Sequence, residues 1–135
     1  MIVTHVIPRI ITESSGPAQS IPGLCESLAQ QDVDLTLCLL EPHIVSLGKG
    51  YRVQDFTVLP LPLAFRWGLS PALSRGLRQS ARHSDILHSH GLWMLPNLYP
   101  LRAVRGTDCK LVVSPRGTLS MEAMSRAPIK KKIMK

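Results

Sequence analysis

Short apolar runs recur along the chain, and each is bounded by polar or turn-forming residues. Such runs predict buried strands of a parallel sheet, because helices cover both faces of that kind of sheet. The first run is rich in Ile and Val, as is typical of a central strand. The predicted strands occupy residues 1–7, 34–40, 51–59 (with a core at 56–59), 85–88 and 110–114.

Between these runs, apolar positions follow a helical period. Because Pro22 fits best in a first turn, the first helix is expected to begin near Ser20. The Ser-Pro pair at 70–71 marks the start of a second helix. The stripe of the first helix, with spacings of three and four residues, is made of Ile21, Leu24, Cys25, Leu28 and Ala29. The second repeats Leu73, Leu77 and Ala81; residues 92–104 and those from 121 onward are predicted helices, and 64–69 are expected to be irregular.

Strands that alternate with helices predict an α/β fold built on a doubly wound parallel sheet. At 135 residues, the chain is expected to form one domain, residues 1–135. Neither a Gly cap nor a polar tail follows the final predicted helix. We therefore expect the domain to be truncated at its C-terminal end.

Two of the predicted strands end in polar residues that can carry chemistry. The fourth leads to His90, and the fifth leads to Arg116, Gly117 and Thr118. Ligands of open α/β sheets bind beyond the carboxyl ends of the strands, so these residues are expected to face one pocket. A His there can polarise a substrate hydroxyl, and the arginine fork suits phosphate or carboxylate. For the arginine, a solvated surface turn is the alternative.

His88 and His90 stand two residues apart on a predicted strand and therefore point to the same face. We expect His88 to be packed and hydrogen bonded, and His90, next to Gly91, to be exposed at the strand tip. The spacing can hold a metal, but no Cys or acidic residue continues the pattern, so no metal is expected.

The loop before the first helix contains Ser14, Ser15 and Gly16. Small residues allow close approach of the backbone to a ligand, and helix N-terminal N–H groups favour phosphate or carboxylate. The loop is neither a dinucleotide-binding glycine fingerprint nor a P-loop, so NAD and ATP are not supported. An ordinary strand-to-helix turn is the alternative.

Charge is distributed unevenly. Residues 1–101 hold seven basic and seven acidic residues, whereas residues 102–135 hold nine and two, so the net charge of +7 lies at this end. The run Lys130-Lys131-Lys132 is either a solvated helix face or a peripheral contact with an anionic membrane. Nucleic acid is not expected as a partner, because only 4% of residues are aromatic and no nucleic-acid-binding motif is present.

Cysteine usage bears on the compartment. The three cysteines fit no metal spacing, and the first residues resemble a strand rather than a signal peptide. We therefore expect reduced thiols in a cytoplasmic protein, with Cys25 and Cys38 as small core residues. No apolar run approaches the roughly 18 to 20 residues that a membrane-spanning helix needs.

Four segments match a known family in combination. They are Ser-Gly-Pro-Ala from residue 15, Ile-Pro-Gly-Leu from residue 21, Asp-Ile-Leu-His-Ser-His-Gly-Leu-Trp from residue 85, and Val-Val-Ser-Pro-Arg-Gly-Thr-Leu from residue 112. Together they resemble the N-terminal domain of retaining glycosyltransferases of the GT-B architecture, and more narrowly the bacterial glycosyltransferase family four. The likeness spans nearly the whole chain, although residues 41–83 match only in pattern.

The resemblance implies a Rossmann-like domain that faces a second domain across a cleft. The first domain would bind a carbohydrate or lipid-linked acceptor, and the second a nucleotide-sugar donor such as a UDP- or GDP-hexose, without a metal or another cofactor. Ser15 and Gly16 would lie beside the reacting phosphate or sugar, and His90 would be a catalytic residue near the transferred sugar. Arg116 stands where many relatives carry His, and Ser15 where many carry Gly.

The leading hypothesis is the acceptor-side half of a glycosyltransferase in cell-surface polysaccharide synthesis, located in the cytoplasm or at the inner face of the cytoplasmic membrane. The donor-binding domain and its paired glutamates are not among these 135 residues. Transition-state stabilisation needs both walls of the cleft, so this chain alone is expected to be inactive. The alternative is a non-catalytic sugar- or phosphate-binding α/β module.

Overall fold

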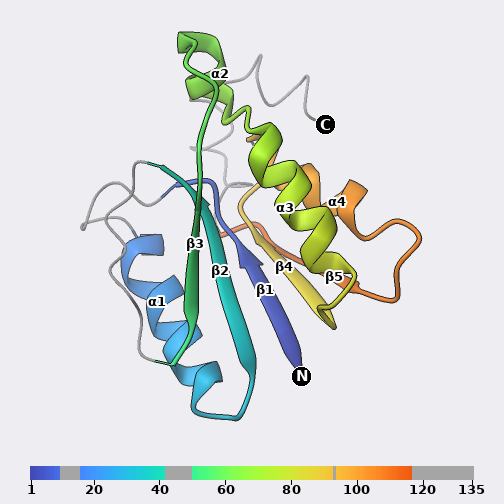
Figure 1. The fold of residues 1–135 in the computed structure, drawn as a ribbon. Helices are drawn as coiled ribbons and strands as arrows, with labels where there is room; N and C mark the ends of the chain where they lie inside the picture. The colour runs from blue at the N-terminus through green and yellow to red at the C-terminus, as the bar shows by residue number, and fades with distance from the viewer. Residues whose placement is uncertain (10–15, 42–49, 93, 117–135) are drawn as a thin grey trace.

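Strands and helices alternate along the chain, as the apolar pattern predicts (Figure 1). The computed structural model describes residues 1–9, 16–41, 50–92 and 94–116. The elements are β1 (Ile2–Val6), α1 (Gly16–Ala29), β2 (Asp34–Leu40), β3 (Arg52–Phe56), α2 (Pro62–Trp67), α3 (Pro71–Ala81), β4 (Ile86–His90), the 3-10 turn η1 (Leu95–Asn97), α4 (Tyr99–Ala103) and β5 (Lys110–Ser114).

The strands form one all-parallel, five-stranded sheet in the order β3-β2-β1-β4-β5. This order confirms the predicted α/β, Rossmann-like fold. The chain builds outward from β1 to β3 and then returns to place β4 on the other side of β1 (Figure 1). The boundary between β1 and β4 is therefore the topological switch point, where ligands of open α/β sheets bind.

Helices cover both faces of the sheet: α1 lies on one side, and α3 and α4 on the other (Figure 1). The predicted stripe of α3 is confirmed, since its Leu and Ala positions are buried. The core beneath α3 and α4 consists of Val6, Cys38, Leu40, Leu73, Leu77, Ala81, Leu87, Ala103 and Cys109. The core beneath α1 consists of Ile7, Ile21, Cys25, Leu35, Leu37, Leu39 and Tyr51.

The cysteines are free and buried, as expected for core thiols. Burial raises the pKa of Cys25 and of Cys38 to about 12, so neither is a thiolate near neutral pH. No helix in the described ranges is long and apolar enough to cross a bilayer.

The third strand differs from its prediction. β3 ends at Phe56, so the predicted strand core at 56–59 is wrong. The strand lies at the sheet edge, where most of its residues are exposed and an apolar run is not needed. Its register places Arg52 beside Thr36 and Phe56 beside Leu40, so pairing ends where β2 ends.

Helix boundaries also differ. α1 begins at Gly16 instead of near Ser20 and contains Pro22, because burial of the surrounding apolar stripe outweighs one lost backbone hydrogen bond. The segment at 64–69, predicted to be irregular, lies largely within α2. This helix starts at a Pro and is capped at its C-terminal end by Gly68, with φ 72°. Of the described residues in the predicted helix at 92–104, those of η1 and α4 are helical, and the helix predicted from 121 lies outside the described residues.

Candidate functional site

The carboxyl ends of β4 and β5 bring together the two principal predicted residues. Arg116, two positions beyond β5, donates its Nε–H to Nδ1 of His90 at 2.8 Å. Its Nη1 donates to Oγ of Ser20 on α1 at 2.8 Å. One guanidinium thus joins β4, β5 and α1, which confirms that His90 and Arg116 share one edge of the sheet. The roles assigned to them remain predictions.

Arg116 holds an unusual backbone conformation for a residue with a side chain. Its φ is 52°, in the left-handed region that a residue with a Cβ enters at a cost of about 1–2 kcal/mol. The side chain is exposed at the residue level, yet its guanidinium turns back to a buried histidine. Backbone strain of this kind concentrates at functional sites.

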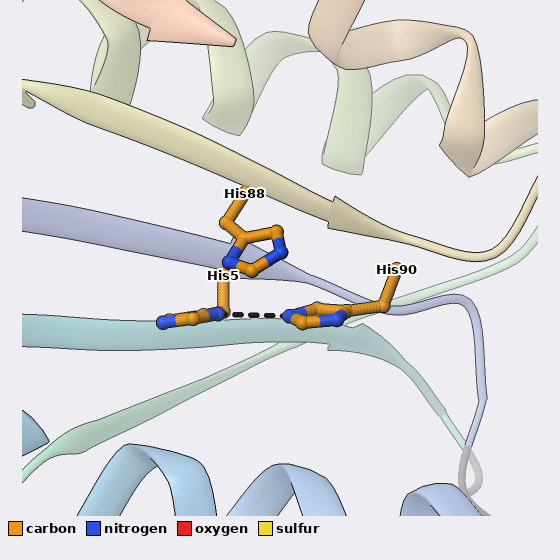
Figure 2. A group of neighbouring side chains, drawn as sticks. All are labelled: His5, His88 and His90. Atoms are coloured by element: carbon orange, nitrogen blue, oxygen red, sulfur yellow. Dashed lines mark hydrogen bonds between the residues drawn. The ribbon is translucent and has the colours of Figure 1, made fainter. Parts of the chain in front are cut away.

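A third histidine, which the sequence did not single out, completes the group. His5 comes from the middle of β1, and its register partner on β4 is His88. Nδ1 of His5 lies 2.9 Å from Nε2 of His90, and the two rings meet edge to edge (Figure 2). The ring of His88 stacks on that of His90 with centroids 4.1 Å apart, and its Nε2 is 2.7 Å from Oγ of Ser114.

The predicted exposure of His90 is wrong, whereas His88 is packed and hydrogen bonded as predicted. His90 was expected to be exposed at a strand tip, but its side chain is only 1% exposed, whereas His88 is half-buried. The reason is that β4 continues through His90 instead of ending at residue 88. The ring of His90 therefore lies on the face of the sheet, between His5 and Arg116.

Burial keeps these imidazoles neutral. Loss of solvent, together with the nearby His88 and Arg116, lowers the pKa of His5 from 6.5 to about 4. The same burial, with His88, His5 and Arg116 nearby, lowers the pKa of His90 to about 3. The pKa of His88 is also lowered, first by burial and then by Arg116. None of the three is positively charged at neutral pH.

The three histidines raise the question of a metal centre, since one nitrogen from each lies within 4.8 Å of the others. A shared ion needs in-plane lone pairs that converge on one point about 2 Å from each nitrogen. His88 is stacked over His90 with only 29° between the ring planes, so their lone pairs run alongside each other. The cationic Arg116 also occupies Nδ1 of His90. This arrangement fits a hydrogen-bonded group better than a metal centre.

The chain beyond His90 is held by Asn97 of η1. Its Nδ2 donates to the carbonyl oxygen of His90 at 2.9 Å, and its Oδ1 accepts from the backbone N–H of Met94 at 3.2 Å. Gly91 turns the chain with φ 93° and donates its N–H to the carbonyl oxygen of Ser114 at 2.8 Å. The ends of β4 and β5 are therefore fixed relative to each other.

Of the remaining predicted site residues, the structure describes Gly16, which begins α1 at the same edge of the sheet. The other predicted contacts lie outside the described residues: Ser15, Gly117, Thr118 and the lysines at 130–132.

Sequence reasoning missed three members of the site, namely His5, Ser20 and Asn97. His5 had a usable signal, because an ionisable residue in the middle of a strand rich in Ile and Val is unusual. Ser20 and Asn97 had none, since their positions depend on helix orientation and loop path.

Comparisons with known proteins leave the family open. No protein-family description matches this sequence, and no curated protein sequence matches it significantly. A crystal structure of the pilus retraction motor PilT with bound ADP aligns with 83% of this chain, at 14% identity and a TM-score of 0.39. The aligned part covers 30% of the PilT chain, so this chain spans less than a third of that protein. A likeness this distant has no bearing on function.

Proposed function

We propose that this chain is the acceptor-side half of a retaining glycosyltransferase, which moves a hexose from a nucleotide-sugar to a carbohydrate or lipid-linked acceptor. The observation that carries the proposal is the meeting of His90, Arg116 and Ser20 at the switch point of the sheet. Sheets of this type bind ligands at that crevice. The strands β4 and β5, which carry two of the motifs that resemble the family, end at the same edge.

The site suits an anionic ligand group. Arginine carries five N–H donors, and two of those on Arg116 are engaged by other described residues, which leaves three available within the described part of the chain. α1 is 14 residues long, and its N-terminus carries a partial positive charge. Ser20 lies near that end of α1, so its hydrogen bond brings Arg116 close to the helix N-terminus. A diphosphate, such as the one in a nucleotide-sugar, matches both features. Ser15 and Gly16 are the proposed backbone contacts, with Gly117 and Thr118 beside Arg116.

The role of Arg116 is testable by ligand binding. Replacement of Arg116 by Gln keeps a hydrogen-bond donor but removes the charge, so the dissociation constant for inorganic pyrophosphate should rise at least about tenfold. Isothermal titration calorimetry at low ionic strength measures the change. Arg78→Gln, on the exposed face of α3, is the matched control for the lost charge and should leave binding intact. Equal affinities for the Arg116→Gln variant and wild type would remove the proposed anion site.

The need for a second wall gives another prediction. Residues 1–135 alone should show no sugar transfer from UDP- or GDP-hexoses, because donor contacts from a second domain are required for transition-state stabilisation. Release of the nucleoside diphosphate, followed by phosphorus NMR, measures turnover. Turnover that Arg116→Gln abolishes would show that this chain carries a complete active site, against our proposal.

A non-catalytic sugar- or phosphate-binding module is the second candidate, and one observation favours it. His90 is 1% exposed, and both of its ring nitrogens already have hydrogen-bond partners. A buried imidazole with a pKa of about 3 is poorly suited to general acid catalysis near neutral pH. Pyrophosphate binding without any transfer by a two-domain form of the protein would favour this candidate.

A further inference from the structure

We propose that His5 is a positioning residue for Arg116, acting through His90 to fix the direction in which the guanidinium faces its ligand. The relay runs from Nδ1 of His5 to Nε2 of His90, and from Nδ1 of His90 to Nε of Arg116. It deepens the proposed function, on which it rests for the identity of the ligand as a phosphate-bearing anion. Its evidence is the chemistry of the two hydrogen bonds.

The first step follows from the donor inventory of arginine. A guanidinium has donors only, so Nδ1 of His90 must be the acceptor of the 2.8 Å hydrogen bond. A neutral His90 then carries its proton on Nε2. The hydrogen bond with Arg116 therefore selects one of the two tautomers of His90.

The second step passes the constraint to His5. The Nε2–H of His90 lies 2.9 Å from Nδ1 of His5, which must accept it. Both side chains are almost fully buried, so solvent cannot replace this acceptor. With an apolar residue in place of His5, His90 would hold a buried donor without a partner, and its ring would no longer be held in the plane that meets Arg116.

The third step concerns what His5 gives up. Its Nδ1 accepts, so its own proton is on Nε2, and this buried atom has no hydrogen-bond partner among the described residues. An unsatisfied buried donor lowers stability. A Val or Leu at this central strand position would avoid that cost only if position 90 were apolar as well, since His90 would otherwise lose its acceptor. A buried pair of histidines in place of an apolar pair is expected where their acceptor nitrogens have a use.

The last step links the relay to ligand affinity. An arginine side chain loses rotamer entropy when it is fixed. The contacts with His90 and Ser20 fix Arg116 before a ligand arrives, so binding need not supply that cost. Without the relay, Arg116 keeps its N–H donors, but its guanidinium is no longer held in one direction by His90.

The first test is spectroscopic and needs no ligand. Nitrogen-15 NMR of the wild-type chain should show His90 and His5 both protonated on Nε2, and a slowly exchanging Nε–H for Arg116. His90 protonated on Nδ1 would overturn the relay, because that nitrogen could not accept from Arg116.

The variant test compares two replacements of His5. Phe keeps a ring of similar shape without an acceptor, whereas Asn places its Oδ1 near the position of the lost Nδ1. His5→Phe should speed exchange of the Arg116 Nε–H by at least about tenfold and raise the pyrophosphate dissociation constant by about fivefold to tenfold. His5→Asn should restore much of both.

Val3→Ala is the matched control, since Val3 is a buried residue of β1 on the same face. It should destabilise the chain while leaving the Arg116 Nε–H protected. Unchanged Arg116 exchange in His5→Phe, or equal loss in Val3→Ala, would overturn the positioning role. Failure of the wild-type chain to bind pyrophosphate would instead overturn the proposed function, while the NMR signals still decide the role of His5.

Discussion

The two faces of the β1–β4 pair both carry fully buried side chains, yet they are built differently. Toward α3, Val6 and Leu87 pack against Leu73 and Leu77, and all four are fully buried. Toward α1, the same two strands present His5, His88 and His90. The difference therefore does not come from burial or from strand position.

Polar satisfaction also separates the two faces. Thr4, on the α3 side, shares a 2.8 Å hydrogen bond with Ser84, so its buried hydroxyl has a partner. On the other face, Nε2 of His5 is buried without a partner among the described residues. One face follows the rules of a stable core, and the other departs from them where the proposed ligand site lies. The comparison predicts that stability depends mainly on the first face and anion binding on the second.

The largest expected effect of a single substitution on stability is on the apolar face. Leu77→Ala should lower the free energy of unfolding by about 2–5 kcal/mol, because the fully buried side chain leaves a cavity under α3. Urea unfolding followed by circular dichroism measures it. Arg78→Ala, the exposed neighbour on α3, should change stability by no more than about 0.5 kcal/mol. A loss below about 1 kcal/mol for Leu77→Ala would contradict the prediction that stability depends mainly on the apolar face.

Acid should act through the histidine face. The pKa values of His5 and His90 are about 4 and 3 in the folded chain and near 6.5 when unfolded, so the unfolded chain binds more protons between these limits. Their contribution is therefore present above pH 6.5 and is lost as pH falls toward 4 and then 3. The slope is about 1.4 kcal/mol per pH unit for each histidine.

Urea unfolding at pH 7 and at pH 4.5 measures this slope. The contributions of other titrating groups to the slope cancel when variants are compared with wild type. His5→Phe should show a shallower slope than wild type, whereas Leu77→Ala should keep the wild-type slope at lower stability. Equal slopes for His5→Phe and wild type would contradict the neutral, buried state of His5.

The smallest effect is expected for His5→Phe at pH 7.5. The change leaves Nε2–H of His90 without a partner but removes the unpartnered Nε2–H of His5, so one orphan replaces another. The net loss should be about 1 kcal/mol, the value of one hydrogen bond. Thermal unfolding measures it. A loss as large as that of Leu77→Ala would show that both faces serve stability alike.

The fold class was predictable because the apolar period differs between strands and helices, as at 34–40 and along α3. Boundaries were harder. α2 was missed because its exposed Leu and Phe residues form no stripe, and α1 was expected to start late because Pro22 is tolerated inside it. For α1, tertiary packing overrode the local pattern.

The site was predictable only as far as strand ends could be located. The carboxyl ends of parallel strands meet at one edge, which was enough to place His90 beside Arg116. The burial of His90 depends on two further residues of β4 and on a ring contact with β1. Pairing of β1 with β4 is a long-range choice that no local pattern encodes, so the sequence could mark His5 as unusual within its strand but could not place it beside His90.

That long-range pairing has a consequence for how the protein acquires its site. His5 and His90 are 85 positions apart, and their contact depends on β4 docking beside β1. The strands β1, β2 and β3 pair with partners that are closer in sequence, so they can pair without closing the long loop between β1 and β4. We expect the histidine contact to be among the last to form during folding, so its NMR signals would report the completed sheet instead of a collapsed intermediate.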